Sequence, residues 1–444
     1  MSHSETIRRW WCIGAIALTA SLSASDALAQ GRYDVTDLGS LGGLRATARS
    51  VNELGQVAGT FRRPDGTVVA FLWDKGQVIL LPPAAGLPES DAYGLNNRSE
   101  VVGVSEGFPN QPTLSVATVW RSGSPVALPH EIDRTWAGDI NDSGIIVGSA
   151  RSGPGLVWIN DRVYILPSGR GVARAANEMG QIVGDQFPSH YNSFAVMWDL
   201  RTRTIGRVGT DLGSCDTHAM DINDFGVAAF GDYCWSPYQA HLWIDGRTEP
   251  LPPLPNTNRS DVTAVNNRNV AVGACGDHSE FPTIWENGEP TALNDLIDPG
   301  TGWYLVFASD INEMGQIVGE GAFNGQRHAF LLTPRDMMAL SPPEPGRSGE
   351  VNTIIVQGAS PGATVSLFYS RAPGFTAIKA CDRLGLNLDD ARFVAQAVAD
   401  GEGRASLRAF IPNRGSGLTI YLQAVETTGL RHCRQTNLVR ALID

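Results

Sequence analysis

A short hairpin pattern recurs seven times along this 444-residue chain, and it restricts the possible fold more than any other feature. Each copy begins with a small residue, usually Ala, and reaches an Asn followed by a turn that often contains Gly. It then closes in a β-run that usually ends in Val-Gly. Asn and Gly tolerate positive φ, so they suit a tight hairpin turn. The copies begin at Ala46, Ala92, Ala137, Ala173, Ala219, Val262 and Ala308, and their turn asparagines are Asn52, Asn96, Asn141, Asn177, Asn223, Asn266 and Asn312.

A second unit follows each hairpin after a loop of variable length, and it ends in an apolar residue followed by Trp. A turn and a short Leu-containing strand come next, so each repeat holds four strands in about 43 residues. That is the size and strand count of a propeller blade. We predict that the Trp side chains fill the wedges between blades rather than contact a ligand. They are Trp73, Trp120, Trp158, Trp198, Trp243 and Trp285, and Leu332 takes this position in the seventh copy.

The seventh repeat has only three strands, whereas an extra strand at Tyr33–Gly39 precedes the first repeat. If this strand pairs with His328–Thr333, it completes the last blade and removes both sheet edges. The sequence therefore predicts an all-β fold: a seven-bladed β-propeller closed by an N-terminal strand, plus a C-terminal β-sandwich.

The flanking segments complete the predicted domain organisation. Arg8 and Arg9, an apolar run and Ala27-Leu28-Ala29 have the pattern of a cleaved signal peptide over residues 1–29, favouring the general secretory route over twin-arginine export. The propeller is expected over 30–340 and a Pro-rich linker over 341–349. Short alternating strands over 350–444 favour the sandwich. We expect a secreted or periplasmic protein.

Composition excludes some classes of partner. The formal net charge of −12, with only 34 Lys and Arg, argues against nucleic acid, whose phosphates need a basic surface. After the signal segment no run of about 18 apolar residues occurs, so no membrane insertion is expected. We expect a monomer.

The repeat resembles the HAF repeat of predicted extracellular bacterial proteins. The motifs that carry this resemblance are ASDINEMGQIVG with HAFLL, and AGDINDSGIIVG with GLVW, and the resemblance covers residues 33–334. The chain departs from the pattern at Phe230, where Gly is usual, and at Asn269, which replaces the turn Gly. The resemblance implies export and a repeat architecture but no defined activity. The C-terminal segment, with GASPGATVSLFYS and IYLQAVE, looks like small sandwich modules of secreted repeat proteins, which implies adhesion or spacing.

Five cysteines follow the signal segment, and export makes disulfides the expected state. Cys215 and Cys234 are equidistant from the fifth hairpin turn, so they would face each other across an antiparallel pair. Cys381 and Cys433 form the C-terminal pair. Cys275 remains, either buried and free or as an exchange partner for Cys234.

Neither a metal nor a cofactor is expected. The segment Asp139–Gly144 superficially resembles a calcium loop but lacks the alternating oxygen ligands and the distal Glu. Cys215 with His218, and Cys275 with His278, have local zinc-like spacing but lie at different points of neighbouring repeats. The usual hydrolase, zinc-protease and phosphate-loop motifs are absent from the sequence. A Ser/His/Asp triad is not excluded, but nothing in the sequence indicates one.

The longer loops, which would share one face of the ring, carry aromatic residues interleaved with charges. This mixture on a rigid scaffold suits a glycan or peptide surface, although the aromatics could simply pack the loops. Arg62, Arg63, Asp65, Phe108, Phe187, His190 and Tyr191 belong to this set. The fifth and sixth repeats and the start of the seventh supply the candidate ligand-binding residues Asp232, Tyr233, Trp235, Tyr238, Asp277, His278, Glu280, Trp303 and Tyr304.

Three functions are compatible with these observations. The first is an exported non-catalytic protein whose loop face binds an extracellular glycan or protein. The second is a propeller hydrolase or lyase that acts on a polysaccharide or peptide, with Asp232, Asp277 and His278 as acid–base candidates. The third is a purely structural matrix protein. The absence of catalytic motifs favours the first.

Overall fold

The structure is a computed structural model that describes residues 31–444 apart from 85, 108–113, 131, 133, 168, 189–191, 210–215, 234–236, 279, 380, 382 and 429–432. The described chain contains β-strands and two short 3-10 turns, η2 (Leu293–Leu296) and η3 (Asn413–Gly415), and no α-helix. The predicted all-β class is confirmed. The predicted signal peptide lies outside the described residues. None of the helical segments described is long and apolar enough to cross a membrane.

Five four-stranded antiparallel sheets follow one another along the chain, and in each of them a strand pairs with the next strand in sequence. Repeated four-stranded meanders of this kind are consistent with propeller blades. The sheets consist of β6 (Glu89–Leu95), β7 (Val101–Glu106), β8 (Ser115–Arg121) and β9 (Ser124–Ala127); β10 (Thr135–Ile140), β11 (Ile146–Ala150), β12 (Gly155–Ile159) and β13 (Arg162–Ile165); β14 (Gly171–Ala176), β15 (Gln181–Gln186), β16 (Phe194–Asp199) and β17 (Thr204–Arg207); β18 (Thr217–Ile222), β19 (Ala228–Asp232), β20 (Gln239–Ile244) and β21 (Arg247–Leu251); and β22 (Ser260–Val265), β23 (Ala271–Cys275), β24 (Phe281–Glu286) and β25 (Glu289–Ala292).

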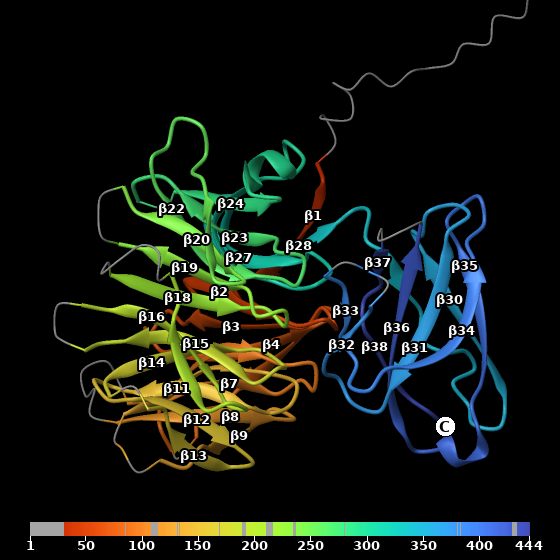
Figure 1. Cartoon of the computed structure of the whole chain (residues 1–444), viewed down its shortest axis with the longest axis horizontal. Coiled ribbons are helices and arrows are strands. Elements are labelled where there is room, and N and C mark those ends of the chain that lie inside the picture. Colours follow the sequence, from red (N-terminus) through yellow and green to blue (C-terminus); the bar gives the residue numbers. More distant parts are fainter. Residues whose placement is uncertain are drawn as a thin grey trace, which may run out of the picture.

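An eight-stranded sheet joins the two ends of the repeat region. Its strands are β2 (Arg45–Val51), β3 (Val57–Arg62), β4 (Val68–Asp74) and β5 (Gln77–Leu81), with β26 (Trp303–Ile311), β27 (Ile317–Phe323), β28 (Gln326–Pro334) and β1 (Tyr33–Gly39). β1 pairs antiparallel with β28, from Tyr33 opposite Pro334 to Gly39 opposite Ala329, and the two strands lie together in Figure 1. β2 contacts β28 through one parallel pair, Arg45 with Arg327. The predicted pairing of the N-terminal strand with the final repeat is therefore confirmed.

The turn asparagines join neighbouring sheets through their side-chain amides. Each Nδ2 donates to the backbone oxygen of the next turn asparagine at 2.9–3.2 Å. Asn312 Nδ2 donates to Asn52 O at 3.0 Å across 260 residues of sequence, so the seven side chains form a closed circuit. In its own turn, Asn52 Oδ1 accepts the amides of Leu54 and Gln56. Each position thus needs a donor and an acceptor on one short side chain, which Asn provides and Asp does not.

A second circuit runs through the residue that follows each asparagine. Its backbone N–H donates to a side-chain oxygen of the corresponding residue in the next repeat at 2.5–2.9 Å, and Glu313 N closes the circuit on Glu53 Oε1 at 2.8 Å. The two circuits together give a partner to the backbone oxygen of each turn asparagine and to the N–H of the residue that follows it. The members are Glu53, Asn97, Asp142, Glu178, Asp224, Asn267 and Glu313.

The small residues of the hairpin pattern have a geometric cause. Every inner strand carries a bulge directly after its buried alanine or valine, for example between Ala137 and Asp139. Opposite this bulge, the neighbouring strand approaches so closely that a Cβ on Gly148 would lie 2.0 Å from the carbonyl oxygen of Trp136. A side chain therefore cannot be placed there without moving the backbone, which explains the repeated Val-Gly ending.

The predicted packing role of the tryptophans is confirmed. Trp120, Trp158, Trp198 and Trp285 are fully buried, and Trp73 and Trp243 are partly exposed. Three of the buried indoles donate to a proline carbonyl at the end of the preceding sheet, as Trp120 Nε1 does to Pro82 O at 2.6 Å. Each of these side chains thus packs at a junction between sheets and contributes a directional bond as well as apolar area.

The C-terminal module (β29–β38, Ala339–Leu442) consists of two main sheets around one apolar core that includes Ile354, Val365, Leu367 and Leu407. A two-stranded sheet lies beside them. The first main sheet holds β29 (Ala339–Leu340), β30 (Val351–Gln357) and β35 (Ala405–Phe410), the second holds β34 (Arg392–Val398), β31 (Thr364–Ser370), β36 (Thr419–Thr427), β37 (Cys433–Gln435) and β38 (Val439–Leu442), and the small sheet holds β32 (Thr376–Ala377) and β33 (Gly385–Leu386).

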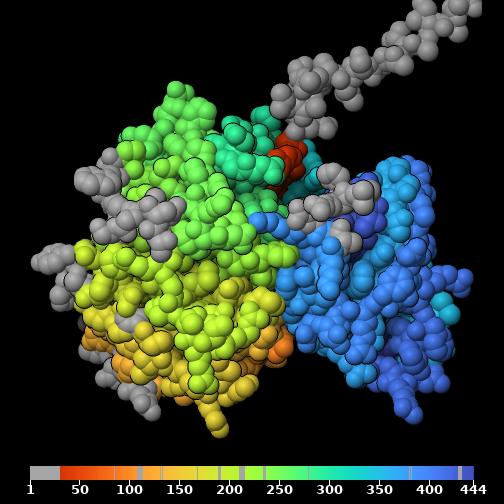
Figure 2. Space-filling view, viewed as in Figure 1, coloured from red at the N-terminus to blue at the C-terminus, as the bar shows by residue number. Residues whose placement is uncertain are grey.

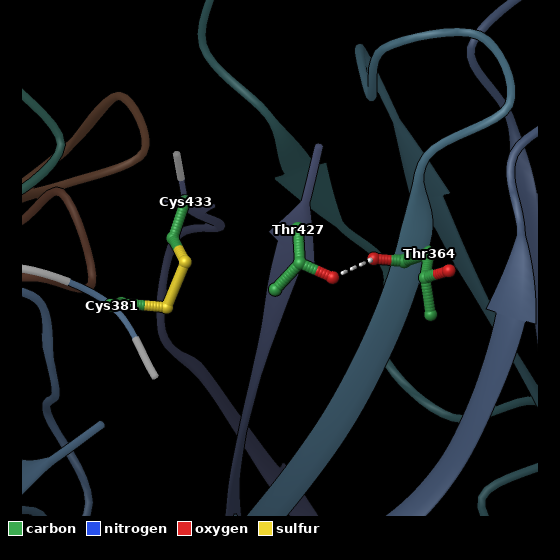
Figure 3. The surroundings of a disulfide bond; sticks show 4 residues. All are labelled: Thr364, Cys381, Thr427 and Cys433. Carbon is green, nitrogen blue, oxygen red and sulfur yellow. Dashed lines mark hydrogen bonds between the residues drawn. A yellow bond between two sulfur atoms is a disulfide. The ribbon is translucent and has the colours of Figure 1, made fainter. Parts of the chain in front are cut away.

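The predicted bridge between Cys381 and Cys433 is confirmed, with Cα atoms 5.7 Å apart (Figure 3). It ties the loop before β33 to β37. On the neighbouring strands, Thr427 Oγ1 donates to Thr364 O at 3.5 Å, beside the same edge of the sheet. Cys275 is buried and free, and the predicted bridge between Cys215 and Cys234 lies outside the described residues.

The C-terminal module packs against the turn side of the repeat region (Figures 1 and 2). Leu54 contacts the apolar cluster around β33, and Leu438 N donates to Glu53 O at 3.3 Å. Phe225, in the fifth turn, meets the edge of Phe375 with ring centres 5.4 Å apart. The module therefore covers the end of the repeat region that carries the asparagine circuit.

The asparagine circuit makes a substitution test possible. Asn177→Asp removes the donor to Asn223 O and adds a carboxylate beside Glu178 and Asp224, so we expect a loss of about 1–3 kcal/mol in the free energy of unfolding. Asn287→Asp, in an exposed turn, is the matched control and should change stability by less than about 0.5 kcal/mol. Urea unfolding measures both. Equal effects of the two substitutions would contradict the role of the circuit.

Candidate binding groove

A cavity of about 190 Å³ lies at the turns and is lined by their inner residues together with Gly374 and Asn387 of the C-terminal module. Eight carboxyl groups line or surround it. Burial raises the pKa of Asp139 to about 6 and that of Asp221 to about 8, and the charge of Asp310 raises the pKa of Asp221 further. The eight are Glu53, Asp139, Asp142, Glu178, Asp221, Asp224, Asp310 and Glu313.

These carboxyl groups act as structural acceptors. Asp139, Asp221 and Asp310 accept the amides of Ala176, Val265 and Val51 at 2.8–3.0 Å from the neighbouring repeat. Among the residues that the structure describes, no group of three or more His, Cys, Asp or Glu side chains is arranged to hold a metal ion.

A larger groove of about 640 Å³ lies at the opposite ends of the same strands. β10 illustrates the geometry, because Trp136 near its start lines the groove whereas Asn141, just after its end, belongs to the asparagine circuit. A six-residue strand separates its ends by roughly 20 Å. The C-terminal module covers the turn end, so the groove lies on the side of the repeat region away from the module.

The groove has charges of both signs, drawn from different loops. The acidic side chains of the groove are Glu89, Asp91 and Glu106, which lie on β6 and β7. Asp91 accepts a hydrogen bond from the hydroxyl of Thr60. Desolvation and the two neighbouring carboxylates raise the pKa of Glu106, and Arg151 opposes that effect.

The basic side chains of the groove are all arginines: Arg62, Arg134, Arg151 and Arg170. Arg62 donates to the carbonyl of Gly66 at 2.8 Å. Arg134 adopts a left-handed backbone conformation, with φ of 61°, and so does Ser152 in the next loop, with φ of 58°. Left-handed residues other than Gly also occur in hairpin turns elsewhere in the described chain, so these two describe the shape of the loops.

Apolar side chains complete the groove. Trp136 is 36% exposed and Leu114 is 46% exposed, while Phe187 is partly buried. An exposed aromatic ring between arginines and carboxylates provides a stacking surface for a sugar or an aromatic side chain. Arg62 and Phe187 belong to the loop residues singled out from the sequence, whereas Arg134, Trp136 and Arg151 were missed. Only their positions in the repeat could have indicated them. Arg134 and Trp136 lie at the start of an inner strand, and Arg151 lies directly after the second strand of the same repeat.

The described candidates of the fifth repeat, Asp232, Tyr233 and Tyr238, lie outside the groove and contact one another or charged neighbours. Asp232 pairs with His241 at 3.3 Å. The ring of Tyr233 lies 5.2 Å from that of Tyr238, which in turn lies 4.5 Å beneath the Arg259 guanidinium. Burial raises the pKa of Tyr233 to about 12, and the charge of Asp261 raises it further. The described candidates of this repeat are thus packed aromatic and charged side chains.

The remaining candidates are dispersed. Glu280 Oε2 accepts the amide of His278 at 3.2 Å, and Asp277 O lies 3.4 Å from the Arg259 guanidinium. Trp303 stacks on Phe323 at 5.1 Å, and with Tyr304 it lines a different cavity of about 370 Å³. Trp235 lies outside the described residues.

A Ser–His–Asp arrangement that the sequence did not indicate occurs between β15 and β18. Ser193 Oγ and His218 Nε2 are 3.0 Å apart, and His218 Nδ1 and Asp185 Oδ2 are 3.0 Å apart. Ser193 is 6% exposed, and Arg174 also pairs with Asp185, at 2.7 Å.

The same layer contains an equivalent contact elsewhere. Thr47 occupies the same repeat position as His218, directly before the inner-strand alanine. Glu320 likewise occupies the position of Asp185, directly after the glycine of the second strand. The hydroxyl of Thr47 donates to Oε2 of Glu320 at 2.7 Å. We therefore interpret His218–Asp185 as one of a set of polar links between sheets.

No family model and no curated protein matches the chain. Among solved structures, YCF48 in its complex with D1 peptide is similar with a TM-score of 0.45 and 14% identity, covering 68% of this chain and 97% of that chain. TolB from Acinetobacter baumannii is similar with a TM-score of 0.35 and 14% identity, covering 63% of this chain and 79% of that chain.

The buried carboxyl groups predict a pH dependence of stability. In an unfolded chain an Asp carboxyl titrates near pH 4, so Asp139 and Asp221 bind protons more tightly in the folded state. Their contribution to stability is complete below about pH 4 and is lost as the pH rises to about 6 and 8, respectively. The free energy of unfolding should therefore fall between pH 5 and 8, by up to about 1.4 kcal/mol per pH unit for each group.

Thermal unfolding across this pH range is the measurement. Asp221→Asn retains an oxygen acceptor for the Val265 amide and removes the ionisation, so it should flatten the profile above pH 6. Asp245→Asn, in an exposed turn, should leave the profile unchanged. Stability that rises from pH 5 to pH 8 in the unsubstituted protein would contradict this account.

Proposed function

We propose that this chain is an exported, non-catalytic binding protein that engages an extracellular glycan or protein through the groove. Its repeat region, in this proposal, is a closed seven-bladed β-propeller and its C-terminal module is a β-sandwich. The seven turn asparagines support the blade count, because each belongs to its own four-strand repeat and the last one bonds to the first. Secretion or periplasmic residence rests on the signal-peptide pattern of residues 1–29.

The position of the groove carries the binding proposal. The C-terminal module occupies the turn side of the repeats, whereas the groove lies at the other strand ends. Its volume falls within the range of small-ligand sites, which is roughly 300–1,000 Å³. A module that packs over one face leaves the other free to meet a large polymer, and the module itself can act as a spacer.

The alternative is a hydrolase or lyase, and the observation that favours it is the Ser193–His218–Asp185 geometry. A nucleophile needs access to the scissile bond. Ser193 is almost entirely buried, whereas Leu114, Trp136 and Arg151 in the groove are exposed. Binding therefore takes precedence over catalysis in this proposal.

A pair of substitutions tests where the ligand binds. Immobilised polysaccharides and extracellular proteins are screened first, and the best ligand is then titrated. Trp136→Ala should weaken binding at least tenfold, because it removes the aromatic surface of the groove. Tyr304→Ala, which removes a ring that is 53% exposed outside the groove, should change affinity less than twofold. Urea unfolding of both variants verifies that they remain folded.

Three results would overturn the proposal. A larger loss with Tyr304→Ala would move the site to the seventh repeat. Absence of binding across the whole panel would remove the binding function. Turnover of a polymer that is abolished by Ser193→Ala would establish hydrolysis instead.

A further inference from the structure

Three of the four arginines of the groove come from loops of two neighbouring repeats. Arg134 precedes β10, Arg151 follows β11 and Arg170 precedes β14. Backbone bonds help to fix their spacing, because Arg151 N donates to Arg134 O at 2.8 Å and Gly171 N, next to Arg170, donates to Gly153 O at 3.0 Å. Their guanidinium groups are thus carried on a backbone that is itself hydrogen-bonded between loops.

This group of arginines lies in a chain whose overall net charge is −12. A guanidinium offers a planar fork of donors that matches a carboxylate bidentately, which an ammonium group does not. The negative net charge of the chain repels polyanions, so an anionic ligand needs local positive charge of the kind that these arginines provide.

The carboxylates of the same groove restrict the ligand further. Carboxylate oxygens can accept hydrogen bonds, and the carboxylates Glu89, Asp91 and Glu106 would repel a chain that carries a negative charge on every unit. A ligand that fits both parts carries an anion at one position and hydroxyl or amide donors at the next. Trp136 lies in the same groove as a platform for a pyranose ring.

We propose that the groove binds an acidic glycan in which a uronate alternates with a neutral sugar, with the uronate carboxylate at Arg134, Arg151 and Arg170 and the donors of the neutral sugar at Glu106 and Asp91. This inference rests on the binding function proposed above. It adds the class of ligand and the residues that select it.

Hyaluronan, which has this alternation, and its methyl ester are the probes, because they differ only in the charge of the carboxyl group. We expect at least tenfold tighter binding of hyaluronan, with an affinity that falls as salt rises from 50 to 500 mM. Arg151→Gln should reduce the preference for the acid at least fivefold. Arg162→Gln, an exposed arginine on β13 outside the groove, should leave the preference unchanged.

The other outcomes distinguish the inference from the proposed function. Equal affinity for hyaluronan and its ester would overturn the inference, and so would an unchanged preference in Arg151→Gln. Both results would leave polymer binding intact. Tighter binding of dextran sulfate than of hyaluronan would assign the arginines to sulfate instead. Binding of an extracellular protein but of no glycan would contradict the ligand class, and binding of nothing would overturn the proposed function itself.

Discussion

The side-chain amide of the turn asparagine is the contact on which the architecture depends. It bonds to its own turn through Oδ1 and to the next repeat through Nδ2, so one residue both shapes the hairpin and fixes its neighbour. The same contact joins the last repeat to the first. A net hydrogen bond contributes about 1 kcal/mol, but an unpaired buried amide costs more, so the circuit is strongest when every member is present.

This circuit also decides where the molecule can interact. The turns form a flat polar rim that the C-terminal module contacts through Leu54, Phe225 and Glu53. The opposite strand ends are joined by loops of variable length, which carry no constraint from the circuit. Arginines, carboxylates and an exposed tryptophan are found there in one groove. The division between a fixed face and a variable face follows from the repeat itself.

Much of the fold follows from local rules that a single sequence reveals. The spacing of the asparagines gave the repeat and the unpaired strand at Tyr33–Gly39 gave its closure, because an edge strand must find a partner. The packing of the tryptophans was predicted from the size of the side chain, and the C-terminal disulfide from the fact that Cys381 and Cys433 are the only pair of cysteines in that segment. The bulge in each inner strand was not predicted from the sequence. Its only signal in the sequence is the glycine on the neighbouring strand, and a glycine at that position could equally well mark the end of a strand.

The site was harder to predict. Aromatic residues of the fifth repeat and of the start of the seventh were predicted to bind a ligand, yet Tyr233 and Tyr238 pack on each other and Trp303 packs on Phe323. The groove arginines lie 17 and 19 residues apart in sequence, in separate loops, and no periodic pattern marks them. A site assembled from neighbouring repeats depends on the orientation of side chains at strand ends, which periodicity does not specify.

Native-state hydrogen exchange of the β1 amides tests the closed ring most directly. If β1 and the asparagine circuit complete one cooperative structure, the amides of Asp34 and Thr36, which face β28 in this register, should exchange only through global unfolding. Their free energy of opening should then equal that of amides in β15, in the middle of the repeat region. Exchange of β1 many times faster than β15, with its own smaller opening free energy, would show that the first strand is a detachable edge and would contradict the closed ring.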